Sequence, residues 1–251
     1  MFNKRGQLTI FILIGIFVIL IGLISIYFYN PSILGFGGPT VDKNTFEFCV
    51  KDSIDNLIVD LSMTGGFTGA YFNKSYMGVS VPYVCYSDEY YKPCVVQTPF
   101  LEEVFKESFK DSIDGEIQKC YNKFVEDFKR QGYSVVEGEV EITADILPEI
   151  IRLKIDAPLS VSDGESSSGY DSFTIELPTK IYSILMLANA IVGYEISYGT
   201  FDLIQSQLYY PDTLVNAFKP GDGTTVYVIN YGEINYQFAV RSYVFPPGYG
   251  G

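Results

Sequence analysis

Histidine and tryptophan are both absent from the 251-residue chain, and only four cysteines are present. Histidine is the one side chain whose ordinary pKa lies near neutral pH, so its absence removes the usual general base and every Ser-His or Cys-His arrangement. The chain also has no C-x-x-C pair, no P-loop and no dinucleotide-binding glycine fingerprint. We therefore expect no enzymatic activity, no cofactor, and no zinc or other metal site.

Positive charge is scarce as well. The chain has 17 lysines and arginines against 30 aspartates and glutamates, a formal net charge of −13. Such an acidic surface repels nucleic acid and anionic lipid, so we expect no nucleic-acid partner. Glu137, Glu139 and Glu141 alternate on what reads as one face of a strand, where we interpret them as solvated side chains. The acidic loop at 163–165 lacks the ligand spacing of an EF-hand.

Charge and proline are both missing from Leu8 to Phe28, which contains 21 residues. As a helix rising ~1.5 Å per residue, this stretch spans the ~30 Å hydrocarbon core of a bilayer. Lys4 and Arg5 precede it and Tyr29 follows it, so the positive-inside rule places the N-terminus in the cytoplasm and the rest outside the cell. We expect a single-pass protein of the cell membrane that contacts the lipid bilayer through Leu8 to Phe28.

Two other interpretations of this stretch remain. A cleaved secretory signal has a shorter apolar core and a small-residue cleavage site, whereas this core leads into Tyr27-Phe28-Tyr29-Asn30-Pro31. A buried helix of a soluble domain usually has one polar face, and this stretch is apolar all round. Both fit the residues less well than a membrane anchor does.

The head of the chain is more specific than a generic anchor. Lys4-Arg5-Gly6-Gln7, followed by Leu8-Thr9-Ile10-Phe11 and the apolar stretch, resembles the class III signal peptide of archaeal type IV pilins. The resemblance implies that a prepilin-type peptidase cuts between Gly6 and Gln7, and that the helix is retained as an anchor and then as the core of a filament. The sequence departs from the pattern at Phe11, the fifth mature position, where many pilins carry glutamate.

The rest of the chain divides into two parts. Residues 30–41 are rich in glycine and proline and read as a linker, which separates the head and helix at 1–29 from an expected extracellular domain at 42–251. We expect this domain to have an α+β fold stapled by disulfides. Its 47% hydrophobic content, taken over the whole chain, is that of a folded protein.

Two amphipathic helices are predicted from apolar residues at three- and four-residue intervals. The first covers Val41 to Met63 and stops at Gly65-Gly66. The second is expected to open at Thr98-Pro99, with the threonine as its cap, and to continue to Gly132. A third, very apolar helix from Ile181 to Tyr194 is too short to cross a membrane, so we interpret it as a core helix, or as a face buried against another subunit.

Alternation of polar and apolar residues predicts antiparallel strands between and after these helices. The chain from Ser162 to Gly169 reads as a loop tip. The predicted strands are Gly78–Val81, Tyr83–Tyr86, Tyr133–Thr143, Glu149–Val161, Ser172–Leu177, Thr213–Phe218, Thr224–Asn230 and Asn235–Phe245.

The four cysteines allow three pairings, of which we favour Cys85 with Cys94 and Cys49 with Cys120. The first pair brackets a polar, turn-like octapeptide, and the second would join the two amphipathic helices. Disulfides persist outside the cytoplasm, which fits the expected location.

Two further features point to surface functions. Asn73-Lys74-Ser75 is an acceptor sequon for N-glycosylation, whereas Asn30 is disqualified by Pro31. The chain also has 21 tyrosines, and four of them surround the small cysteine loop: Tyr83, Tyr86, Tyr90 and Tyr91. Tyrosines of this kind either form contact surfaces or sugar platforms, or simply pack on a strand face.

Two hypotheses about function follow. The first is a structural, pilin-like subunit of an extracellular filament or envelope assembly, which forms homo-oligomers through the apolar helix. The second is a permanently membrane-anchored adhesin or binding module that does not polymerise.

Overall fold

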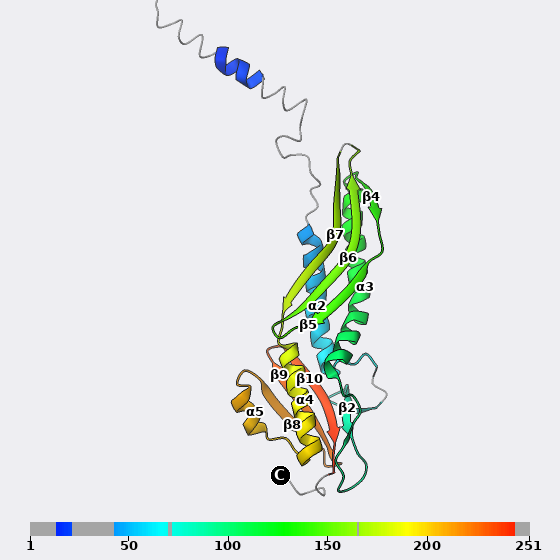
Figure 1. Ribbon diagram of the computed structural model, residues 1–251, viewed down its shortest axis with the longest axis vertical. Coiled ribbons are helices and arrows are strands. Elements are labelled where there is room, and N and C mark those ends of the chain that lie inside the picture. Colours follow the sequence, from blue (N-terminus) through cyan, green and yellow to red (C-terminus); the bar gives the residue numbers. More distant parts are fainter. Residues whose placement is uncertain (1–13, 22–42, 70–71, 165, 244–251) are drawn as a thin grey trace, which may run out of the picture. The chain divides into compact units, whose positions relative to one another are not determined.

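The computed structural model describes residues 14–21, 43–69, 72–164 and 166–243 (Figure 1). The chain divides into two compact units, Met1–Asp42 and Lys43–Gly251. In the first unit, residues 14–21 are helical. Gly6, Gln7 and most of the predicted anchor and linker lie outside the described residues.

The second unit is α+β, with antiparallel-rich sheets and two disulfides, as the sequence predicts. Two long helices, α2 (Lys43–Met63) and α3 (Leu101–Arg130), run side by side (Figure 1). Their facing sides bury the apolar residues that the periodicity singles out, including Phe46, Phe105 and Phe124. The ring of Phe46 lies 4.6 Å from that of Phe173 on the neighbouring sheet, measured between centroids.

The helix α3 does not begin as predicted. Its N-cap is Phe100, and no side chain caps the helix. Thr98 and Pro99 therefore lie before the helix. Glu102 and Glu103 do occupy its first turn, where their negative charges interact favourably with the positive end of the helix dipole.

A four-stranded sheet covers the upper part of the two helices in Figure 1. It consists of β4 (Ser134–Glu137), β5 (Glu141–Ile146), β6 (Ile150–Ser162) and β7 (Ser167–Pro178). All pairs are antiparallel, and β6 is central because the same residues of β6 pair with β5 and with β7. The turn before β7 is shorter than the predicted loop 162–169, because β7 starts at Ser167.

The predicted strand Tyr133–Thr143 is interrupted. Its two halves, β4 and β5, both run along β6, but three residues at 138–140 face two at 157–158. Such an extra residue is a bulge. Glu137 and Glu141 consequently belong to different strands, so they do not share one strand face as predicted, but Glu137, Glu139 and Glu141 are all exposed, as their interpretation as solvated side chains requires.

A six-stranded sheet forms the lower part of the unit (Figure 1). Its strands are β1 (Asn73–Tyr76), β2 (Val79–Tyr86), β3 (Val95–Val96), β8 (Leu214–Phe218), β9 (Thr224–Tyr231) and β10 (Ile234–Arg241). The order is β1-β2-β10-β9-β8, with β3 also paired to β2. The pair β2–β10 is parallel, a contact that the expectation of antiparallel strands did not include.

The apolar helix α4 (Ile181–Tyr198) packs against this sheet and ends at Gly199, which adopts the left-handed conformation. It is one turn longer than predicted, and among the described residues it is the one helix long and apolar enough to cross a bilayer. Eight of its residues are buried within the unit, which supports the interpretation as a core helix. A short helix that was not predicted, α5 (Leu203–Tyr209), contacts β8.

Candidate functional site

The predicted tyrosine cluster lies at the end of the six-stranded sheet where β2 and β10 finish side by side. The disulfide Cys85–Cys94 closes a short loop directly after β2, and Cys49–Cys120 joins α2 to α3. This is the pairing that the sequence favours. Both cysteines of the short loop are buried, so the loop is fixed to the sheet at its base.

Five side chains contact one another in a row at this end of the sheet, through edge-to-face, tilted and cation–π contacts, and we call this row the aromatic stack. The ring centroids of Phe72 and Tyr86 are 4.4 Å apart. The guanidinium carbon of Arg241 lies 5.3 Å from the centroid of Tyr86 and 5.1 Å from that of Tyr243, both within cation–π range. The ring of Tyr90 lies 4.9 Å from that of Tyr243 and completes the stack.

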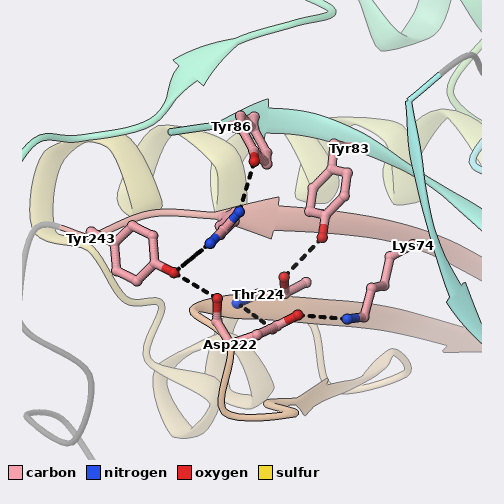
Figure 2. Close-up of polar contacts among 7 residues, drawn as sticks. Lys74, Tyr83, Tyr86, Asp222, Thr224 and Tyr243 are labelled. Atoms are coloured by element: carbon pink, nitrogen blue, oxygen red, sulfur yellow. Dashed lines mark hydrogen bonds and ion pairs between the residues drawn. The ribbon is translucent and has the colours of Figure 1, made fainter. Parts of the chain in front are cut away.

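Hydrogen bonds hold Arg241 in the middle of the stack (Figure 2). Its Nη1 donates to the hydroxyl of Tyr86 at 2.7 Å, and its Nη2 and Nε donate to the hydroxyl of Tyr243 at 2.7 and 3.1 Å. The Tyr243 hydroxyl in turn donates to the carbonyl of Asp222 at 2.7 Å. All three guanidinium nitrogens are thereby engaged by protein groups.

A second set of polar contacts connects β1 and β2 to the turn before β9 (Figure 2). Lys74 Nζ lies 2.6 Å from Oδ2 of Asp222, and the hydroxyls of Tyr83 and Thr224 are 2.8 Å apart. The backbone N–H of Thr224 donates to Oδ1 of Asp222 at 3.0 Å. Partial burial acts to raise the pKa of Asp222, but the bonds from Lys74 and Thr224 outweigh it and lower this pKa to about 2.

Gly223 allows Tyr243 to reach this turn. Its φ is +81°, and a Cβ atom built on it would overlap the ring and hydroxyl of Tyr243. Only glycine combines that backbone angle with such a close approach.

The tyrosines of the predicted cluster divide into two groups. Tyr83 is buried and Tyr86 is half-buried, so these two pack on the strand face. Tyr90 and Tyr91 are 59% and 73% exposed. Tyr91 has a φ of +62°, and its backbone N–H donates to the carbonyl of Tyr243 at 2.8 Å.

Several members of the stack were not identified from the sequence. Phe72, Arg241 and Tyr243 come from segments far from the cysteine loop, and only the fold brings them together. A weak signal exists at Arg241, a single cation two residues before a tyrosine at the end of an otherwise uncharged strand.

The other predicted residues lie elsewhere. Asn73 is exposed at the start of β1, and it shares a face with Ser75, the third residue of the sequon.

Glu137 forms an ion pair with Lys129 at 3.1 Å beside the bulge of β4–β5. An open groove of about 390 Å³ lies there, lined by Gln118, Tyr121, Asn122 and residues 137–140. Among the described residues no group of three or more potential metal ligands is found.

One buried acid stands apart from these surfaces. Glu195 on α4 is 2% exposed and accepts a hydrogen bond from the hydroxyl of Tyr227 on β9. Burial raises the pKa of the Glu195 carboxyl, and the bond from Tyr227 offsets only part of that rise. Burial and the adjacent carboxyl raise the pKa of Tyr227, which therefore remains a donor.

Comparisons of the chain with protein-family models, curated proteins and solved structures found no match. Any functional assignment therefore depends on the residues themselves.

Proposed function

We propose that the chain is a membrane-anchored structural protein of the cell surface, a pilin-like subunit held by its N-terminal helix. The observation that carries the proposal is the uncharged stretch Leu8 to Phe28 behind the head Lys4-Arg5-Gly6-Gln7. Residues 14–21 within this stretch are helical, and their large apolar side chains are 50 to 65% exposed. A helix apolar on all sides is stable in lipid or among other apolar helices, the two environments that a pilin helix occupies in turn.

The second unit supports a role outside the cytoplasm. Two disulfides cross-link it, and such bonds persist in oxidising compartments. The whole chain has a net charge of −13, of which Lys4 and Arg5 contribute +2, so the rest of the chain carries −15. A strongly acidic surface keeps a crowded, exposed protein soluble.

A second candidate function is a permanently anchored adhesin or binding module. It is favoured by Phe11 at the position where many pilins carry glutamate, and by the exposed Tyr90 and Tyr91. In this case the helix stays in the bilayer and the chain does not polymerise.

The mass of the mature N-terminus, measured on protein isolated from envelopes of the native cells, tests the proposal. We expect a chain that begins at Gln7, and filaments that contain it. A Gly6→Ile variant should keep residues 1–6, because a bulky side chain obstructs the peptidase. An intact Met1 on the wild-type chain, together with extraction as a monomer, would contradict the pilin-like role and leave the anchored module.

A further inference from the structure

We infer that Tyr90 and Tyr91, which we call the tyrosine platform, bind a neutral oligosaccharide. The inference concerns the second unit alone, so it holds whether or not the chain forms filaments.

Contacts with Tyr243 hold the ring of Tyr90 and the backbone of Tyr91. One side of the Tyr90 ring packs on Tyr243, which is 5% exposed and whose hydroxyl is fixed by Arg241 and by the carbonyl of Asp222. Tyr91 is tied to Tyr243 by its backbone N–H, and the disulfide closes the loop behind both. A ring and a loop backbone that are fixed before binding lose little entropy when a ligand arrives.

The backbone of Tyr91 is a further sign of a constrained loop. Its φ of +62° is one of two positive values among the described non-glycine residues. A bulky side chain pays for that conformation, and such positions cluster at binding sites. Here the conformation is accompanied by a ring that is 73% exposed, although burial would have stabilised the fold.

A saccharide fits the chemistry of these rings. One face of a pyranose carries several C–H groups with partial positive charge, and the face of an aromatic ring is electron-rich. The sugar hydroxyls can exchange hydrogen bonds with the two phenolic hydroxyls. Tyrosine therefore offers both kinds of contact that a sugar needs.

The charges near the platform point to a neutral ligand. Within the same loop, Glu89 and Lys92 form an ion pair with each other, and Asp88 adds an exposed negative charge that disfavours anionic ligands. Arg241 has all three nitrogens engaged by Tyr86 and Tyr243, so it does not present a free cation. The net charge of −13 repels polyanions, including acidic polysaccharides.

Binding is tested on the full chain in a detergent without a sugar headgroup, such as a dimethylamine oxide. The probes are maltoheptaose, cellohexaose and chitohexaose, measured by saturation-transfer NMR and by calorimetry. We expect at least one of them to bind. Tyr90→Ala and Tyr91→Gly should each weaken that binding about tenfold, which corresponds to about 1.4 kcal/mol.

Two features make the test decisive. Tyr91→Gly removes a ring at a backbone angle that suits glycine, so the variant should fold even if Tyr90→Ala does not. Tyr198→Ser, which removes a 61% exposed tyrosine on α4, is the matched control and should bind like the wild type. The inference is overturned if no probe binds or if Tyr91→Gly binds as tightly as the wild type. It is also overturned if Tyr198→Ser loses as much affinity for the probe as Tyr91→Gly does. Self-association abolished by Tyr91→Gly would assign the platform to a second copy of the chain and would also overturn it.

Discussion

At Gly223 the turn between β8 and β9 leaves no space for a side chain, because Tyr243 lies against it. We predict that Gly223→Ala destabilises the protein by about 2 to 3 kcal/mol, since it combines an unfavourable φ with displacement of Tyr243. Gly221→Ala is the control, because its φ is +88° but its Cβ would meet nothing within 4 Å. It should cost only about 1 kcal/mol in urea unfolding. Equal losses for the two variants would show that Tyr243 is not constrained here.

The buried carboxyl of Glu195 leads to a prediction about pH. Its pKa in the folded state lies above the ordinary value of 4.5, so the folded protein holds this proton more tightly than the unfolded chain does. Its contribution to stability therefore declines as the pH rises from about 4.5 through the raised pKa. We expect Glu195→Gln, relative to the wild type, to gain stability between pH 4 and pH 7.

The measurement is the difference in unfolding free energy between the two proteins, from urea titrations across that range. Glu233→Gln, in the exposed turn between β9 and β10, controls for the loss of one charge. A difference that stays constant with pH would mean that Glu195 ionises as freely in the folded chain as in the unfolded one.

The lowered pKa of Asp222 leads to the opposite dependence of stability on pH, at more acidic pH. Its pKa is lowered from 3.8 to about 2, so the stability that it contributes is present above about 3.8 and is lost as the pH falls through about 2. Asp222→Asn should therefore be less stable than the wild type at pH 5, and the gap should close between pH 4 and pH 2. Asp114→Asn, at an exposed position on α3, controls for the loss of one negative charge.

At this scale the sequence was informative only where chemistry is local. The cysteine pairing and the position of Tyr90 and Tyr91 in the cysteine loop follow from spacing and from turn-like neighbours, whereas the exposure of these two rings comes from the structure. Arg241 and Gly223 could not be identified, because the bond of Arg241 to Tyr86 crosses 155 positions of the chain and the contact of Gly223 with Tyr243 crosses 20. Long-range contacts of that kind depend on strand order, and no local pattern encodes it.

At the scale of elements, the two disulfides should differ in their effect on stability. They close segments with sequence separations of 71 and 9. If constraint of the unfolded chain dominates, the pair Cys49→Ala/Cys120→Ala should lose about 4 kcal/mol and the pair Cys85→Ala/Cys94→Ala about 2.5 kcal/mol. Denaturant unfolding of the two double variants, against the oxidised wild type, measures both losses. A larger loss for the short loop would show that it carries native contacts beyond the bond itself.

Some of the predicted boundaries of helices and strands were wrong for reasons that lie in the elements themselves. Helix periodicity located α2 and the body of α3 well, because their buried stripes are long and regular. The bulge at 138–140 was missed because alternation continues on either side of it while the register shifts by one residue. The short helix α5 was missed because its seven residues make only about two turns, too few for a periodic spacing of apolar residues to be recognised.

At the scale of the whole molecule, the proposed anchor predicts a position-dependent effect of charge. Val18 lies at the centre of Leu8 to Phe28, where a lysine costs roughly 3 kcal/mol of insertion free energy. Val18→Lys should shift part of the chain from the membrane to the soluble fraction after alkaline extraction. Tyr29→Lys, just beyond the stretch, should remain in the membrane because its side chain can reach the interface. If the wild type and both variants were all found in the soluble fraction, the proposed membrane anchor would be contradicted.

The position of Cys49 also has a mechanical consequence. A pull transmitted from the N-terminus enters the second unit at Lys43 and meets the bond to Cys120 only six positions later along α2. From there the covalent bond carries the load directly into α3, so the residues between the two cysteines, whose sequence separation is 71, cannot be drawn out from this side. Reduction would release roughly 250 Å of extra contour length. In the oxidised protein, the segment between these two cysteines therefore adds no length to the chain under such a pull.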